Sequence, residues 1–136
     1  MTRTSELRML RQVCEDAATE KRIKDSDLNT LSAAFGQRFE KALEAVKTKR
    51  VKKYAFKPSN RVVWIVVGRE RDYLIMPAAD FCTCDDFYFR VMDRQVHLCY
   101  HLIAQKIAEA TGSYASYEEE DELYDVLMGE WKRAIA

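Results

Sequence analysis

Two closely spaced pairs of soft metal ligands lie in the second half of this sequence. Each pair has one residue between its members, and 14 residues separate the pairs, which are Cys82 with Cys84 and Cys99 with His101. Zinc binds thiolate sulfur at about 2.3 Å and imidazole nitrogen at about 2.0 Å, in tetrahedral sites that three cysteines and one histidine complete. The spacing therefore predicts one zinc ion held by these four residues.

Other uses of the same residues fit the pairing less well. A disulfide between Cys82 and Cys84 would close a very tight ring, and unrelated buried cysteines would have no reason to occur in pairs. An iron–sulfur or redox site stays open as an alternative. His97 also lies close to Cys99 in the sequence. We favour His101 as the ligand because a helix is predicted to begin there and to present its ring to the site.

The predicted zinc ion would have a structural role. With four protein ligands it has no open position for water or substrate. The sequence contains no GxxxxGK[ST] phosphate-binding loop, no HExxH motif and no Ser, His and Asp set. Both histidines lie beside the predicted site, so a general base elsewhere would have to be a carboxylate. We therefore expect a protein that is not an enzyme.

Short strands and one helix would position the ligands. Strands are predicted at residues 53–57, 61–67 and 72–76, which are rich in β-branched and aromatic side chains. Their short connections favour a three-stranded antiparallel β-meander. A helix is predicted over residues 102–110, with Gly112 just past its end. The zinc ion would then join the end of the sheet to the start of this helix.

Apolar residues recur at helical spacing towards both ends of the chain. Residues 5–24 form the first predicted helix, on which Cys14 is expected to be a small buried side chain rather than a reactive thiol or a ligand. A second helical stretch follows Ser26 as its N-cap, and Gly36 marks either a bend or a boundary between two helices. A last helix is predicted to open at a capping box over residues 116–119.

The composition is that of an ordinary globular domain. The chain has 136 residues, of which 48% are apolar and 32% charged, with four glycines and two prolines. We expect one α+β domain with a helical part at residues 1–47, the β-meander and zinc site at residues 48–111, and an amphipathic C-terminal helix at residues 112–136.

No apolar run approaches the roughly 20 residues of a membrane span, and the N-terminus has no apolar signal region. We therefore expect an intracellular protein, in the cytoplasm or in a eukaryotic nucleus, where thiols stay reduced.

The net charge is zero, but basic and acidic residues occupy different segments. Residues 47–61 hold seven basic side chains and no acidic one, whereas residues 109–130 hold eight acidic side chains and no basic one. Each run is either a binding surface or a solvated face. As a binding surface, the basic run would contact nucleic-acid phosphates, with Tyr54 and Phe56 stacking on single-stranded bases. The predicted phosphate contacts are Lys49, Arg50, Lys52, Lys53, Lys57 and Arg61.

The CxC and CxH pairs after a short β-meander resemble the SWIM zinc-finger family. The chain is also similar to the small SWIM subunits of Shu-type recombination-mediator complexes, over Phe35 and Gly36, over residues 61–76, and over the sequence CYHLIA at residues 99–104. Ala104 occupies the place of an alanine that this subfamily has three positions after the histidine. Tyr100 departs from the family, in which many members have a basic residue between the cysteine and the histidine. The resemblance therefore does not imply phosphate contact by the finger itself.

The resemblance implies a zinc-binding, non-catalytic subunit in homologous recombination and DNA repair. Such a subunit pairs with a RecA-like ATPase paralogue and helps a recombinase to assemble or persist on single-stranded DNA. The last helix would dock on the partner through Tyr124, Leu127 and Trp131, unless these residues pack on the chain's own core. Two other functions stay open, namely a stand-alone nucleic-acid-binding zinc finger and an adaptor between proteins.

Overall fold

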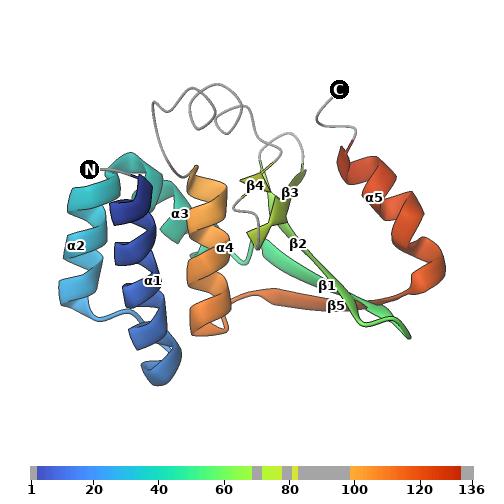
Figure 1. Ribbon diagram of the computed structural model, residues 1–136, viewed down its shortest axis with the longest axis horizontal. Helices are drawn as coiled ribbons and strands as arrows, with labels where there is room; N and C mark the ends of the chain where they lie inside the picture. Colours follow the sequence, from blue (N-terminus) through green and yellow to red (C-terminus); the bar gives the residue numbers. More distant parts are fainter. Residues whose placement is uncertain (1–2, 69–71, 78–80, 83–98, 133–136) are drawn as a thin grey trace.

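A β-sheet lies between four helices at one end of the molecule and a single helix at the other (Figure 1). The computed structural model describes residues 3–68, 72–77, 81–82 and 99–132. In chain order, the elements are α1 (Arg3–Glu20), α2 (Asp25–Phe35), α3 (Gln37–Lys47), β1 (Val51–Lys57), β2 (Arg61–Val67), β3 (Asp72–Met76), β4 (Phe81–Cys82), α4 (Tyr100–Thr111), β5 (Ala115–Glu120) and α5 (Tyr124–Lys132), with a 3-10 turn at Asp121–Leu123 before α5. The fold class is therefore α+β, as predicted. None of the helices in these ranges combines the length and the apolar character that crossing a bilayer requires.

The N-terminal helices form where the apolar periodicity predicts them, with shifted ends. α1 ends at Glu20, four residues before the predicted end. α2 begins at Asp25 with Lys24 as its N-cap, so the assignment of Ser26 as N-cap is wrong. Gly36 lies between α2 and α3 with a φ of 58°, a conformation that glycine adopts without a Cβ clash. It therefore marks a boundary between two helices rather than a bend within one.

Five strands form one mixed sheet in the order β4-β3-β2-β1-β5. β1, β2 and β3 are antiparallel neighbours, so the predicted meander is present at the centre of the sheet. β4 adds an antiparallel edge, where Ile75 pairs with Cys82. β5 adds a parallel edge beside β1. The prediction of three strands was incomplete because two residues, the whole of β4, are too few to give a strand pattern, and because β5 has a helical sequence signature.

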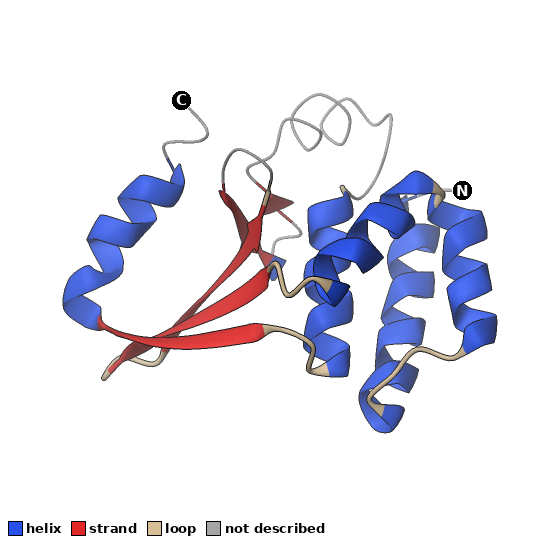
Figure 2. Ribbon diagram, turned by 180° about the vertical axis from the view of Figure 1, so that it is seen from behind, coloured by secondary structure: helices blue, strands red, loops and turns tan. Residues whose placement is uncertain are grey.

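Residues 116–119 belong to strand β5, so the prediction of a helix from this capping box is wrong. Tyr117 pairs with Tyr54 of the neighbouring strand β1, and their rings stack with centroids 5.1 Å apart. Glu118 lies on the same sheet edge, with its Oε1 3.9 Å from the Nζ of Lys57. These contacts and the ladder with β1 override the local helix preference. Figure 2 shows β5 running along the edge of the sheet before the chain enters α5, which begins only at Tyr124.

Alternation along β2 divides the core between the two faces of the sheet. Trp64 and Val66 belong to the larger core cluster, which includes apolar residues of α4, whereas Val63 and Ile65 belong to a smaller cluster with residues of α5. We call these sides of the sheet the α4 face and the α5 face. Trp64, predicted to pack rather than to stack on bases, is 5% exposed. The α4 face is the one that positions the metal ligands.

Candidate metal centre

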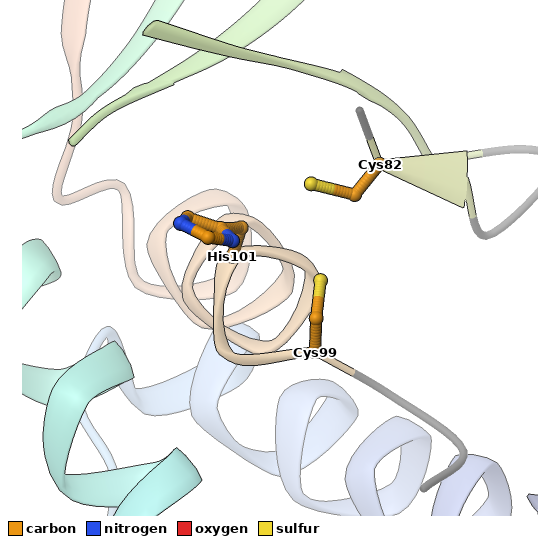
Figure 3. A group of neighbouring side chains, drawn as sticks. All are labelled: Cys82, Cys99 and His101. Atoms are coloured by element: carbon orange, nitrogen blue, oxygen red, sulfur yellow. The ribbon is translucent and has the colours of Figure 1, made fainter. Parts of the chain in front are cut away.

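Three of the four predicted zinc ligands meet where the sheet approaches α4 (Figure 3). Cys82 comes from β4 and is fixed to the sheet by the pairing of that strand with β3. Cys99 is the N-cap of α4, and its carbonyl oxygen accepts a hydrogen bond from the amide of Ile103 at 3.2 Å. His101 is the second residue of α4. The cluster therefore joins the edge of the sheet to the start of one helix, as the spacing predicts.

These three side chains can reach a single ion. Their ligand atoms all lie within 4.8 Å of one another, and the ligand atoms of tetrahedral zinc lie about 3.5–3.8 Å apart when its bonds are about 2.0–2.3 Å long. Cys82 and Cys99 are 0% exposed, and His101 is 4% exposed. The fourth predicted ligand, Cys84, and the alternative histidine, His97, lie outside the described residues.

The donor atoms of this cluster fit zinc. Neither ring nitrogen of His101 has a hydrogen-bond partner among the described residues, and an unpaired buried polar group costs about 1–3 kcal/mol. A zinc ion would bind one of these nitrogens together with the thiolates of Cys82 and Cys99. The N-terminal end of α4 also favours negative charge, which suits a thiolate at Cys99. With Cys84 as the fourth ligand, the ion would have a closed, structural coordination shell.

Aromatic rings enclose the imidazole of His101. The centroid of its ring lies 4.1 Å from that of Tyr73 and 3.8 Å from that of Tyr100. Tyr100, the residue at which this chain departs from the family pattern, therefore packs against the site. Ala104, three positions after the histidine, is 0% exposed and belongs to the larger core cluster. These contacts limit the freedom of the imidazole and separate it from solvent.

Cys14 does not belong to this cluster. Its thiol donates a hydrogen bond to the carbonyl oxygen of Lys106, with a distance of 3.5 Å from Sγ, and its side chain packs against the larger core cluster. Burial raises the pKa of the Cys14 thiol to about 11, an effect that Lys106 partly opposes. The thiol is therefore protonated at neutral pH and is a poor metal ligand and nucleophile. This agrees with the packing role predicted for it.

The predicted nucleic-acid contacts on β1 are divided between the two faces of the sheet. The Nζ of Lys52 lies 5.6 Å from the ring centroid of Tyr117, on the α5 face. The Nζ of Lys53 lies 5.6 Å from that of Trp64, on the α4 face. Strand alternation places Lys57 on the same face as Lys53. These three residues therefore cannot all contact one stretch of nucleic-acid backbone on one face of the sheet.

The other predicted contacts lie at the ends of β1 and β2. Lys49 is exposed in the turn before β1, and the Nε of Arg50 donates a hydrogen bond to the hydroxyl of Thr48 at 3.0 Å. The guanidinium of Arg61 lies over a ring of α5 on the α5 face, 4.1 Å from the centroid of Tyr124. Phe56 is 0% exposed, so the prediction that it stacks on bases is wrong.

The predicted docking residues of the last helix lie against the chain's own sheet. Trp131 is 7% exposed in the smaller core cluster, and Tyr124 and Leu127 are partly buried against that cluster. Their contact with a partner stays a prediction. Among the described residues of α5 and the turn before it, the large apolar side chains that are exposed are Leu123 and Val126, at 42% and 58% exposure. The sequence placed Tyr124, Leu127 and Trp131 on one apolar stripe of the last helix, and Leu123 and Val126 lie outside that stripe.

Comparison with known proteins connects this cluster to a family. No family model matches the chain. A zinc finger SWIM domain-containing protein 7 homolog from Dictyostelium discoideum is 31% identical over 104 residues, which cover 75% of this chain and 67% of the relative. An uncharacterized protein from Archaeoglobus fulgidus is 36% identical over 84 residues, or 62% of this chain and 65% of the relative. The aligned part thus spans about two thirds of the length of each relative. From this similarity and the Cys/His cluster it follows that the chain belongs to the SWIM zinc-finger family.

Proposed function

We propose that this chain is a non-catalytic subunit in homologous recombination, which pairs with a RecA-like ATPase paralogue and supports a recombinase on single-stranded DNA. The observation that carries the proposal is the buried cluster of Cys82, Cys99 and His101 in a chain of the SWIM family. The resemblance to the small SWIM subunits of Shu-type complexes adds the recombination role. Because the sequence has no phosphate-binding loop of the Walker type, a partner would have to supply any ATP hydrolysis.

Zinc would supply stability rather than reactivity in this protein. Bound by Cys82 and Cys99 on different elements, it would hold β4 against the first turn of α4. The zinc ligands would then hold the edge of the sheet against α4, while the sheet supports α5 at its other end. A rigid sheet gives α5 a fixed position from which to present a surface to a partner.

An apolar surface around α5 supports docking of the ATPase partner. Leu123 and Val126 are exposed apolar residues three positions apart, so they are neighbours on one side of the chain at the start of α5. Beside α5, a groove of about 360 Å³ runs between this helix and the sheet, and Val62 and Met76 on its wall are 47% and 38% exposed. Val126 lies two residues from Tyr124 and from Met128, which line this groove, so it lies on the opposite side of the helix. We assign the outward side of α5, with Leu123 and Val126, to the ATPase paralogue.

Affinity purification tests the pairing directly. The tagged chain is recovered from its native cells at moderate salt with nuclease added, and co-purifying proteins are identified by mass spectrometry. We expect a stoichiometric ATPase with a Walker A loop. The variant Val126→Asp should lose this partner because it places a charge on the apolar surface, whereas its melting temperature should stay unchanged since Val126 is 58% exposed.

Ala33→Asp is the matched control for this experiment. It adds the same charge at an exposed helical position on α2, at the opposite end of the molecule from α5 (Figure 1). This variant should retain the partner. Recovery of the unaltered chain without any ATPase would contradict the proposed pairing, and equal recovery of the partner by both variants would contradict its assignment to α5.

Weak DNA binding by the isolated chain is a further expectation. Basic side chains are split between two faces, and acidic residues of β5 lie beside β1, where Glu118 approaches Lys57. Burial raises the pKa of the Tyr54 hydroxyl, and Tyr117, Asp72 and Glu119 raise it further. Fluorescence anisotropy with a labelled oligothymidine measures the affinity between about 50 and 200 mM salt. Tight binding that falls steeply with salt would instead support the stand-alone nucleic-acid-binding finger.

A further inference from the structure

One buried polar side chain follows the metal cluster along α4. Gln105 is 0% exposed, and its Nε2 donates a hydrogen bond to Oε1 of Glu109 at 3.0 Å. Its amide oxygen has no hydrogen-bond partner among the described residues. A glutamine in such a place is unusual, because burying an amide acceptor without a partner costs about 1–3 kcal/mol. The position therefore leaves a buried acceptor that no donor among the described residues satisfies.

The unpaired atoms of this region are chemically complementary. In the described part of the chain, the buried side-chain nitrogen and oxygen atoms without a partner are both ring nitrogens of His101 and the amide oxygen of Gln105. Residues four apart on a helix are neighbours on one side of it, with Cβ atoms about 6 Å apart. When a metal takes one nitrogen of a neutral imidazole, the other nitrogen carries the proton and becomes a donor. The amide oxygen of Gln105, one turn along α4 from His101, is a buried acceptor without a donor among the described residues.

Glu109 fixes which way the amide of Gln105 points. An ionised carboxylate only accepts hydrogen bonds, so the NH2 group of Gln105 must face Glu109 and the oxygen must face away from it. Glu109 lies one turn further along α4, and His101 lies one turn back. The contact at 3.0 Å thus turns the amide oxygen away from Glu109 and leaves it free of this carboxylate.

We propose that Gln105 is a positioning residue for the metal centre: its amide oxygen accepts the hydrogen bond of the non-ligating ring nitrogen of His101 and so fixes the tautomer and orientation of this ligand. Glu109 holds the amide in the orientation that this requires. Hydrogen-bonded partners of ligating histidines typically change metal affinity by 10- to 100-fold when they are removed. The inference rests on the zinc site of the proposed function, but not on its recombination role.

The substitution Gln105→Met separates this role from simple packing. Methionine has a similar length and shape but no amide oxygen. If Gln105 only fills the core, removing a buried unpaired acceptor should leave zinc affinity unchanged and should not lower the stability of the metal-free chain. If it orients His101, zinc affinity should fall by about 10- to 100-fold while the metal-free chain is no less stable. A fall in zinc affinity without a fall in the stability of the metal-free chain therefore distinguishes the positioning role from packing.

Chelator competition on the full chain measures the affinity. Ile107→Met is the matched control, since Ile107 is 1% exposed on the same helix and the substitution introduces the same side chain. We expect Gln105→Met to weaken zinc binding by at least about 10-fold and Ile107→Met to leave it within about twofold. Zinc affinity of Gln105→Met equal to that of the unaltered chain would overturn the proposal.

A measurement on the unaltered protein decides the question if Gln105→Met does not fold. In the zinc-loaded, 15N-labelled chain, the ring N–H proton of His101 should exchange slowly with solvent and should show a nuclear Overhauser effect to the γ protons of Gln105. Rapid exchange without this effect would overturn the assignment of Gln105 alone. No zinc binding by the unaltered chain would overturn the zinc site as well, so the two failures are distinguishable.

Discussion

Replacing Cys99 with alanine should abolish stoichiometric zinc binding and unfold the junction between the sheet and α4. Cys99 is 0% exposed at the N-cap of α4, and its sulfur lies within 4.8 Å of the ligand atoms of Cys82 and His101. A structural zinc ion contributes on the order of 10 kcal/mol to folding, which is comparable with the whole net stability of a domain of this size. Metal content by elemental analysis and thermal unfolding followed by circular dichroism measure both effects.

Cys14→Ala is the control for this substitution. It removes a partly buried cysteine of the same chain whose thiol is protonated at neutral pH and bonds to a backbone oxygen instead of a metal. This variant should keep one zinc ion per chain and should lose only packing free energy. Cys99→Ala protein that retains its zinc and its melting temperature would contradict the assigned ligand set.

Replacing Trp131 with alanine should destabilise the chain by about 3–5 kcal/mol, the usual cost of truncating a buried tryptophan. Trp131 is 7% exposed, and its ring centroid lies 5.0 Å from that of Tyr54. With Phe56 and Ile65 it forms the smaller cluster that holds α5 on the sheet. Urea unfolding of the zinc-loaded protein gives the free energy of unfolding for each variant.

Val126→Ala is the comparison for Trp131→Ala on the same helix. Val126 is 58% exposed, so its truncation should change the free energy of unfolding by less than about 0.5 kcal/mol. A Trp131→Ala variant that is as stable as the unaltered chain but no longer binds the ATPase partner would show that Trp131 docks on the partner instead of packing on the sheet.

Much of the metal centre and the central sheet could be predicted because their signals are local. The CxC and CxH pairs identify their own ligands by residue type and spacing, and three of these four residues lie in the described cluster. The strands Arg61–Val67 and Asp72–Met76 have the predicted bounds because turn residues separate short β-branched runs. Gly112 ends α4 with a φ of 71°, as expected of a glycine just past a helix.

The features that could not be predicted depend on residues far apart in the sequence. The segment Ala115–Glu120 has a helical capping box, and only its pairing with β1 makes it a strand. That pairing also moves the start of the last helix to Tyr124. The burial of Trp131 is one of the two alternatives that the sequence left open. The division of the basic run also depends on a strand boundary, because the predicted strand at residues 53–57 excluded Lys52. The strand begins at Val51, so alternation places Lys52 and Lys53 on opposite faces.

Zinc K-edge X-ray absorption of the purified, unaltered chain tests the central claim most directly, because it counts the ligands and identifies their elements. The zinc site assigned to Cys82, Cys84, Cys99 and His101 predicts three sulfur atoms at about 2.3 Å and one nitrogen at about 2.0 Å. A shell with oxygen ligands or with fewer than three sulfur atoms would contradict this ligand set, and a chain purified without zinc that does not bind it on addition would contradict the metal centre itself.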